Sequence, residues 1–209
     1  MKKNIKIIIL TLIIVITLVF FLFYILSSIN LKNNNKYKIV GNNKSNEEIE
    51  KFLLNVNSYK ANIDVTIISN KNENRYKIIQ EVRENYAKQI VTEPENIANV
   101  EFTYENSTLK IQNSKISASK IYEDYPYVSN NILFLTDFIE QYKKMDTAKT
   151  IDEEETVIIE LLENNSVYNS IKRLKINKQT MKPIYMEIQD INNKKRVYIV
   201  YNEIELNKI

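Results

Sequence analysis

Residues 59–67 read Tyr-Lys-Ala-Asn-Ile-Asp-Val-Thr-Ile, so that every second side chain is apolar or aromatic. A period of two predicts a β-strand with one buried face and one solvated face. The same alternation returns along the chain at Tyr76, Ile78 and Val82, Val100, Phe102 and Tyr104, Leu109 and Ile111, Val157, Ile159 and Leu161, Leu174 and Ile176, Ile184, Met186 and Ile188, and Val197, Ile199 and Tyr201. This spacing indicates an antiparallel meander.

Two segments have helical periodicity instead. Ser45 and Glu48 have the spacing of a capping box, and the apolar residues after them are Ile49, Phe52, Leu53 and Val56. Asn130 or Asn131 is expected to cap a second helix, whose apolar stripe contains Ile132, Leu133, Phe134, Leu135, Phe138, Ile139 and Tyr142. Because helices and strands are segregated, the sequence predicts an α+β domain over residues 46–209, with one large, curved antiparallel sheet and two helices on its concave face.

Turns in this chain must form almost without glycine, because Gly41 is the only one in 209 residues. Asparagine is the usual substitute where φ is positive. It stands where turns are expected, at Asn70 to Asn74, at Asn106 and at Asn192-Asn193. The buried set also moves from odd positions ending at Tyr201 to even positions at Ile204 and Leu206, which predicts a β-bulge near Asn202.

The first 29 residues have the pattern of a membrane anchor. Residues 7–26 are apolar except for Thr11 and Thr17, and twenty helical residues span about 30 Å, the thickness of the hydrocarbon core of a bilayer. A secretory signal peptide has the same charge layout, but its apolar core is shorter and ends at small residues. We therefore expect an uncleaved single span over residues 1–29 and a flexible, Asn- and Lys-rich stalk over residues 30–45. Lysines on both sides of the span leave its orientation undecided.

The composition excludes several classes of function. The chain has no histidine and no cysteine, so it has no imidazole base, no thiolate nucleophile and no zinc site built on these ligands. Its only glycine precedes the domain, which excludes glycine-rich phosphate-binding loops. The net charge of +3 equals the charge of Lys2, Lys3 and Lys6, and the neutral remainder argues against nucleic acid as a partner. We expect no cofactor and no metal.

Carboxylate chemistry stays open as an alternative. A cell-wall enzyme would use a pair such as Glu81 and Glu84, or Asp152 and Glu155. The acidic run over residues 152–155 also has the oxygen ligands that calcium prefers. The alternative is that the glutamates are ordinary surface charges and that residues 145–155 form a solvated loop.

Several local strings resemble the GerS group of germination lipoproteins from spore-forming clostridia. The matching stretches are Glu48 to Tyr59, Glu93 to Ile97, Leu109 to Asn113, Tyr122 to Tyr127, Asn131 to Tyr142, and Thr180 to Pro183. They span most of the domain, and none is a catalytic signature. The resemblance implies a LolA-like open half-barrel and a non-enzymatic protein that binds and activates an N-acetylmuramoyl-L-alanine amidase of the spore cortex.

The resemblance also implies a location and differs from the family in one respect. The domain is expected on the extracytoplasmic side of the inner forespore or cell membrane of a Gram-positive bacterium. The chain lacks the lipidated cysteine of the group, and a spanning helix is expected to provide the anchoring instead. Such a helix is effectively permanent, whereas one acyl chain binds membranes only marginally.

Three tyrosines are the candidate partner-binding residues. Tyr122, Tyr125 and Tyr127 surround Pro126 in a segment without clear periodicity, and tyrosine is enriched at binding surfaces. The alternative is that these rings pack over the sheet as ordinary domain residues. An exposed edge strand could equally bind a partner strand or a second copy of the chain. The functional hypotheses are therefore an amidase accessory protein, a LolA-like lipid or lipoprotein binding protein, and a carboxylate-based wall enzyme.

Overall fold

The computed structural model describes residues 43–125, 131–145, 148–163 and 170–207. The chain divides into two compact units, Met1–Asn42 and Asn43–Ile209, and every described strand and helix belongs to the second. The anchor expected over residues 1–29 and most of the stalk expected over residues 30–45 lie outside the described residues. In the described part, neither helix has the length and apolar character that crossing a bilayer requires.

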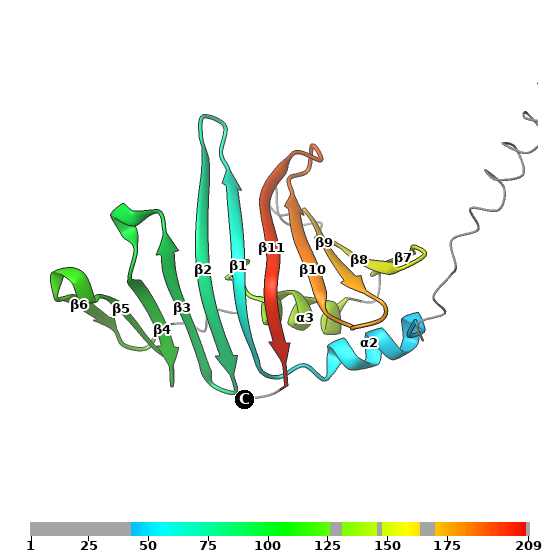
Figure 1. The fold of residues 1–209 in the computed structure, drawn as a ribbon, viewed down its shortest axis with the longest axis horizontal. Coiled ribbons are helices and arrows are strands. Elements are labelled where there is room, and N and C mark those ends of the chain that lie inside the picture. The colour runs from blue at the N-terminus through cyan, green and yellow to red at the C-terminus, as the bar shows by residue number, and fades with distance from the viewer. Residues whose placement is uncertain (1–42, 126–130, 146–147, 164–169, 208–209) are drawn as a thin grey trace, which may run out of the picture. The chain divides into compact units, whose positions relative to one another are not determined.

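One antiparallel sheet of eleven strands forms the body of the second unit (Figure 1). The strands are β1 (Tyr59–Ile68), β2 (Glu73–Arg83), β3 (Tyr86–Glu93), β4 (Val100–Glu105), β5 (Thr108–Asn113), β6 (Ala118–Tyr122), β7 (Lys149–Asp152), β8 (Thr156–Leu162), β9 (Ile171–Asn177), β10 (Pro183–Gln189) and β11 (Lys195–Leu206). Their order is β6-β5-β4-β3-β2-β1-β11-β10-β9-β8-β7, so the first and last strands are neighbours at the centre. The predicted antiparallel sheet is confirmed.

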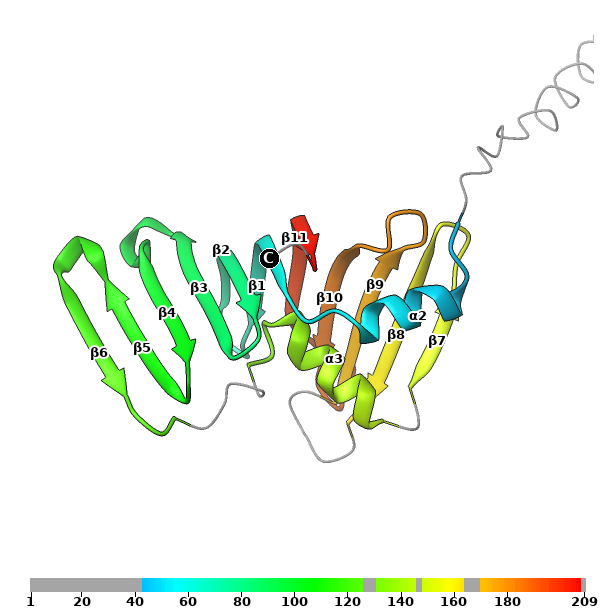
Figure 2. The same ribbon diagram turned by 90° about the horizontal axis from the view of Figure 1, so that it is seen from below.

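Two α-helices, α2 (Asn46–Leu54) and α3 (Leu135–Lys144), lie on the same face of the sheet, which we call the inner face (Figure 2). Their buried residues Ile49, Leu53, Leu135 and Phe138 belong to one core cluster with the inner side chains of β1, β2 and β8 to β11. Strands β4 to β6 contribute only Tyr104 to the buried part of this cluster. The helices therefore cover one half of the sheet, and we call the half formed by β3 to β6 the open half.

Helix α2 forms as its sequence predicts. The Ser45 hydroxyl accepts a hydrogen bond from the Glu48 N–H, and the Glu48 carboxylate accepts one from the Ser45 N–H. This capping box satisfies two backbone donors at the start of the helix. The hydrogen bond from the Ser45 backbone also stabilises the ionised carboxylate and so lowers the pKa of Glu48.

Helix α3 begins later than its sequence predicts. The Asn131 side chain accepts a hydrogen bond from the Leu133 N–H and forms a turn, and the residue at the N-cap position is Phe134, without a side-chain cap bond. The prediction that Asn131 caps the helix is wrong, and Asn130 lies outside the described residues. The first helical N–H, that of Leu135, is instead satisfied by the Tyr59 hydroxyl of β1. A tertiary contact has replaced the local cap.

Three strands were not recognised from the sequence, namely β3, β6 and β7. In β3 the inner position between Ala87 and Val91 is the polar residue Gln89, which interrupts the apolar alternation. Strand β6 is almost wholly exposed, so it has no buried face to mark it. Strand β7 lies in the segment over residues 145–155 that was expected to be only a loop.

The strand irregularities follow the sequence only in part. Along β1 and β11, Asn62 pairs with Glu203 while Ile63 pairs with Tyr201, so Asn202 lies in a β-bulge where the apolar pattern changes phase. Asn106 and Asn193 have positive φ, as expected for turns built without glycine. No residue between Asn70 and Asn74 does; that hairpin is closed instead by the Ser69 side chain, which accepts from the Asn72 N–H.

Candidate binding site

An apolar groove lies on the inner face, over the open half and the neighbouring strands β1 and β2. Its volume is about 480 Å³, and its floor is formed by inner side chains of β1 to β5. Among them are Tyr76, Ile78, Val91, Phe102, Leu109 and Ile111. The wall on the helix side consists of Leu133 and Phe134, and Tyr125 lines the groove as well. Pockets for small ligands usually have about 300–1,000 Å³ and are mostly apolar with a few polar groups, and the groove fits this description.

The helix-side wall is held in place by a buried polar network. The Tyr59 hydroxyl donates to Gln80 Oε1 at 3.0 Å and accepts from the Leu135 N–H at 3.1 Å. Gln80 Nε2 donates in turn to the Leu133 carbonyl at 3.1 Å. Both side chains are completely buried. The segment that carries Leu133 and Phe134 is therefore fixed to β1 and β2 by two hydrogen bonds, and a third bond joins Tyr59 to Gln80 beneath it.

One polar side chain on the groove floor lacks such partners. Gln89 is only 6% exposed and lines the groove, and it stands in register between Gln80 of β2 and Phe102 of β4. In the described part of the chain, its amide nitrogen has no hydrogen-bond partner. A buried donor without a partner is costly. Sequence reasoning missed this residue because a glutamine at a strand position has no distinctive signal.

Two of the three tyrosines singled out from the sequence lie together beside the groove. The Tyr122 and Tyr125 rings have their centroids 6.2 Å apart, and Lys120 Nζ lies 4.7 Å from the Tyr122 ring centroid. The Tyr125 N–H donates to the Ser107 carbonyl, which fastens the segment to the β4–β5 turn. Tyr127 lies outside the described residues. Tyr125 thus packs on the domain and also lines the groove, and Tyr122 lies beside it.

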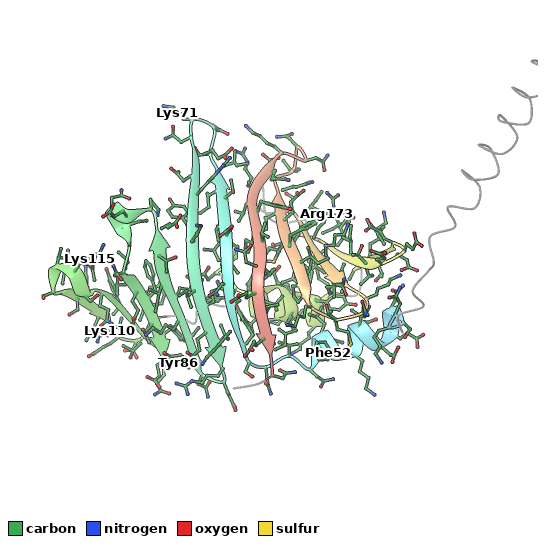
Figure 3. All side chains as sticks on the ribbon, in the orientation of Figure 1. Phe52, Lys71, Tyr86, Lys110, Lys115 and Arg173 are labelled. Carbon is green, nitrogen blue, oxygen red and sulfur yellow. The ribbon has the colours of Figure 1, made fainter. Side chains whose placement is uncertain are left out.

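The β5–β6 hairpin forms the outer edge of the open half. Residues 108–122 contain three lysines, Lys110, Lys115 and Lys120, and no acidic residue; Figure 3 shows the first two at this end of the sheet. Two apolar side chains are also exposed here, Ile116 at 71% and Ile121 at 57%. Strand β6 pairs only with β5 in the part of the chain that the structure describes. The edge therefore combines positive charge, apolar side chains and unpaired backbone groups.

Glu81 and Asp152, one from each carboxylate pair considered for catalysis, are engaged with lysines. Glu81 lies 3.7 Å from Lys60. Asp152 pairs with Lys178, and the hydrogen bond from this lysine lowers the pKa of the carboxyl group. Within the described ranges, no cluster of three or more acidic side chains could hold a metal ion.

Under the helices lies a buried ion pair that does not border the groove. Lys172 Nζ on β9 is 2.9 Å from Asp137 Oδ2 on α3, and the two side chains are 3% and 2% exposed. Gln141 Nε2 also donates to Asp137. Desolvation raises the pKa of Asp137 even though the Lys172 ammonium acts against it. The pair connects α3 to the sheet, and neither group is free to react.

Several solved structures are similar in fold to this domain. A chain in the structure of the CwlD amidase from Clostridioides difficile in complex with the GerS lipoprotein aligns with a TM-score of 0.50 and 23% identity, over 78% of this chain and 96% of that one. An uncharacterized conserved protein from Thermus thermophilus also has a TM-score of 0.50, at 9% identity, over 78% and 88%. These likenesses establish the fold.

A third similar structure is that of a LolA superfamily protein from Nitrosomonas europaea, which aligns with a TM-score of 0.36 and 10% identity, over 78% of this chain and 94% of that one. No family model matches the sequence, and no curated protein matches it.

Proposed function

We propose that this protein is a non-enzymatic accessory factor that binds and activates a spore cortex N-acetylmuramoyl-L-alanine amidase during sporulation, so that the cortex becomes competent for germination. A single N-terminal span would hold the domain on the extracytoplasmic side of the inner forespore or cell membrane. The fold is shared with a chain of a complex between an amidase and a lipoprotein. This likeness supports a protein partner of the same kind.

The observation that carries the proposal is the β5–β6 edge. Its three lysines and exposed Ile116 and Ile121 fit a partner surface that is acidic around an apolar centre. The unpaired backbone groups of β6 would accept a strand of the partner, as exposed edges do in other complexes. The same edge could pair with a second copy of the chain, which would appear as a homodimer.

Binding of residues 43–209 to a cortex amidase tests the proposal directly. This unit contains all described strands and the whole described core, so we expect it to fold without residues 1–42. Isothermal titration calorimetry should show a complex, and Ile121→Glu should weaken it at least about tenfold, because a carboxylate would be buried without a partner. Raising the salt concentration should also weaken it.

The matched control is Ile191→Glu, which introduces the same charge at an isoleucine that is 63% exposed in the β10–β11 turn. This variant should bind like the wild type. Absence of a complex with the wild-type domain would refute the proposal. If the two variants bind the amidase with equal affinity, the β6 edge is not the binding surface. Sedimentation velocity of the domain alone separates a homodimer from a complex with the amidase.

The groove favours a second candidate function, binding of a lipid or a lipoprotein in the manner of LolA. It is apolar, it has the size of a ligand pocket, and neither α2 nor α3 contributes a residue to its lining. Mass spectrometry of lipid extracts from the purified domain tests this function. Co-purifying acyl lipid at a constant ratio is expected, and a domain that binds no lipid after exposure to vesicles would refute it.

A further inference from the structure

The inner groove has a chemical asymmetry that a purely apolar binding site would not have. Gln89 is the polar residue on its floor whose amide nitrogen has no partner among the described residues. Its neighbour Gln80, at the paired position of β2, uses both amide atoms in hydrogen bonds. The same residue type is thus satisfied on one strand and unsatisfied on the next.

We propose that Gln89 donates a hydrogen bond to the ester carbonyl of a membrane phospholipid, one acyl chain of which lies in the groove. This proposal rests on the lipid-binding function considered above and adds its ligand class and its specificity residue. The terminal torsion of a glutamine side chain is broad, so a small rotation can turn the amide toward a ligand. Among the described residues this donor has no partner, and the carbonyl of the ligand would accept a hydrogen bond from it.

The surroundings of the groove favour a phospholipid over an apolar side chain of a partner protein. Lys120 stands over the Tyr122 ring, and Tyr122 lies beside Tyr125, which lines the groove. A cation is therefore available near a groove that is otherwise apolar. An anionic phospholipid presents an apolar chain, an acceptor carbonyl and a phosphate in sequence, which matches these three features. The predicted anchor over residues 1–29 would keep the domain within reach of such lipids.

Ether-linked lipids give a direct test, because they have the same chains and the same head group but no carbonyl. Residues 43–209 are incubated with vesicles that contain equal amounts of diacyl and dialkyl phosphatidylglycerol, and the lipid that stays with the protein through gel filtration is measured by mass spectrometry. The wild type should retain the ester form in about tenfold excess, since a site built to hydrogen-bond a group rejects the analogue that lacks it.

Gln89→Leu should retain both lipids equally. It should also unfold at a higher urea concentration than the wild type, because a buried donor without a partner is removed. The matched control is Gln112→Leu on β5, which carries the same substitution on the opposite face of the sheet, where the Gln112 amide donates to Glu101. This variant should keep the ester preference.

The outcomes separate the proposal from the function on which it rests. If the wild type retains no lipid, lipid binding itself is refuted, and an apolar side chain of a partner protein becomes the expected occupant of the groove. If the wild type retains both lipids equally, or if Gln89→Leu keeps the preference, the domain still binds lipid and the role of Gln89 is refuted.

Discussion

Removal of a single oxygen atom, by Tyr59→Phe, should destabilise this domain more than most substitutions of its size. The Tyr59 side chain is 0% exposed, and its hydroxyl bonds both Gln80 Oε1 and the Leu135 N–H. Phenylalanine fills the same space but leaves both of these buried partners unsatisfied. Each unsatisfied group costs about 1–3 kcal/mol. We expect a loss of about 2–4 kcal/mol, because the phenyl ring is cheaper to desolvate than the phenol.

Urea unfolding of residues 43–209 measures this loss as a lower transition midpoint at an unchanged slope. In hydrogen exchange, the substitution should accelerate the Leu135 amide more than the amides of β1, because the start of α3 loses its cap. Tyr185→Phe is the control: this residue lies on the outer face beside Tyr198 and should change the free energy of unfolding by less than about 0.5 kcal/mol. A loss for Tyr59→Phe no larger than that of the control would refute the network as the support of the groove wall.

Three further predictions concern other parts of the fold. Lys172→Met should cost about 3–5 kcal/mol because it leaves Asp137 buried without its cation, and Asp137→Leu added to it should restore most of that loss in urea unfolding; failure to restore it would contradict the pairing. Burial raises the pKa of Asp190, but hydrogen bonds from the Lys194 and Asn192 amides and the Arg196 guanidinium outweigh it, and the net pKa is lowered. The ionised Asp190 therefore stabilises the fold above its unfolded pKa of about 3.9, and this contribution is lost as the pH falls through the folded pKa. Asp190→Asn should make the urea unfolding midpoint depend less on pH between about pH 5 and pH 2, and an unchanged pH dependence would refute this role. Ser45→Ala should cost about 1 kcal/mol by removing the cap of α2, whereas an unchanged midpoint would show that the helix is held by packing alone.

Strand recognition from sequence succeeded where alternate side chains are apolar and failed where that alternation is interrupted or absent. Strands β1, β8 and β11 alternate because their inner residues enter the core. Strand β3 was missed because its inner position Gln89 faces a groove rather than the core, and β6 because almost none of it is buried. Of the missed strands, β3 lies in the groove floor and β6 forms the outer edge of the open half, whereas β7 lies at the opposite end of the sheet. Binding surfaces depart from the apolar pattern by their nature.

The candidate site was predictable only in outline. Tyr122 and Tyr125 do lie beside the groove, but nothing in their local sequence indicates which strands form its floor. Nothing in the sequence marked Gln89, Leu133 and Ile121 as residues of the site, because their role depends on neighbours far away in the chain. Helix α3 shows the same limit, since its first N–H is capped by Tyr59, 76 residues earlier.

Local spacing of side chains alone determined that this domain is an antiparallel sheet with two amphipathic helices, where α2 begins and where β11 changes phase. These features depend on residues a few positions apart, whose mutual geometry is set by the backbone. The order of the strands, the half of the sheet left uncovered, the network under Leu133 and the unpaired amide of Gln89 were decided by the tertiary structure. They result from contacts between residues distant in sequence, where packing and burial outweigh any local preference.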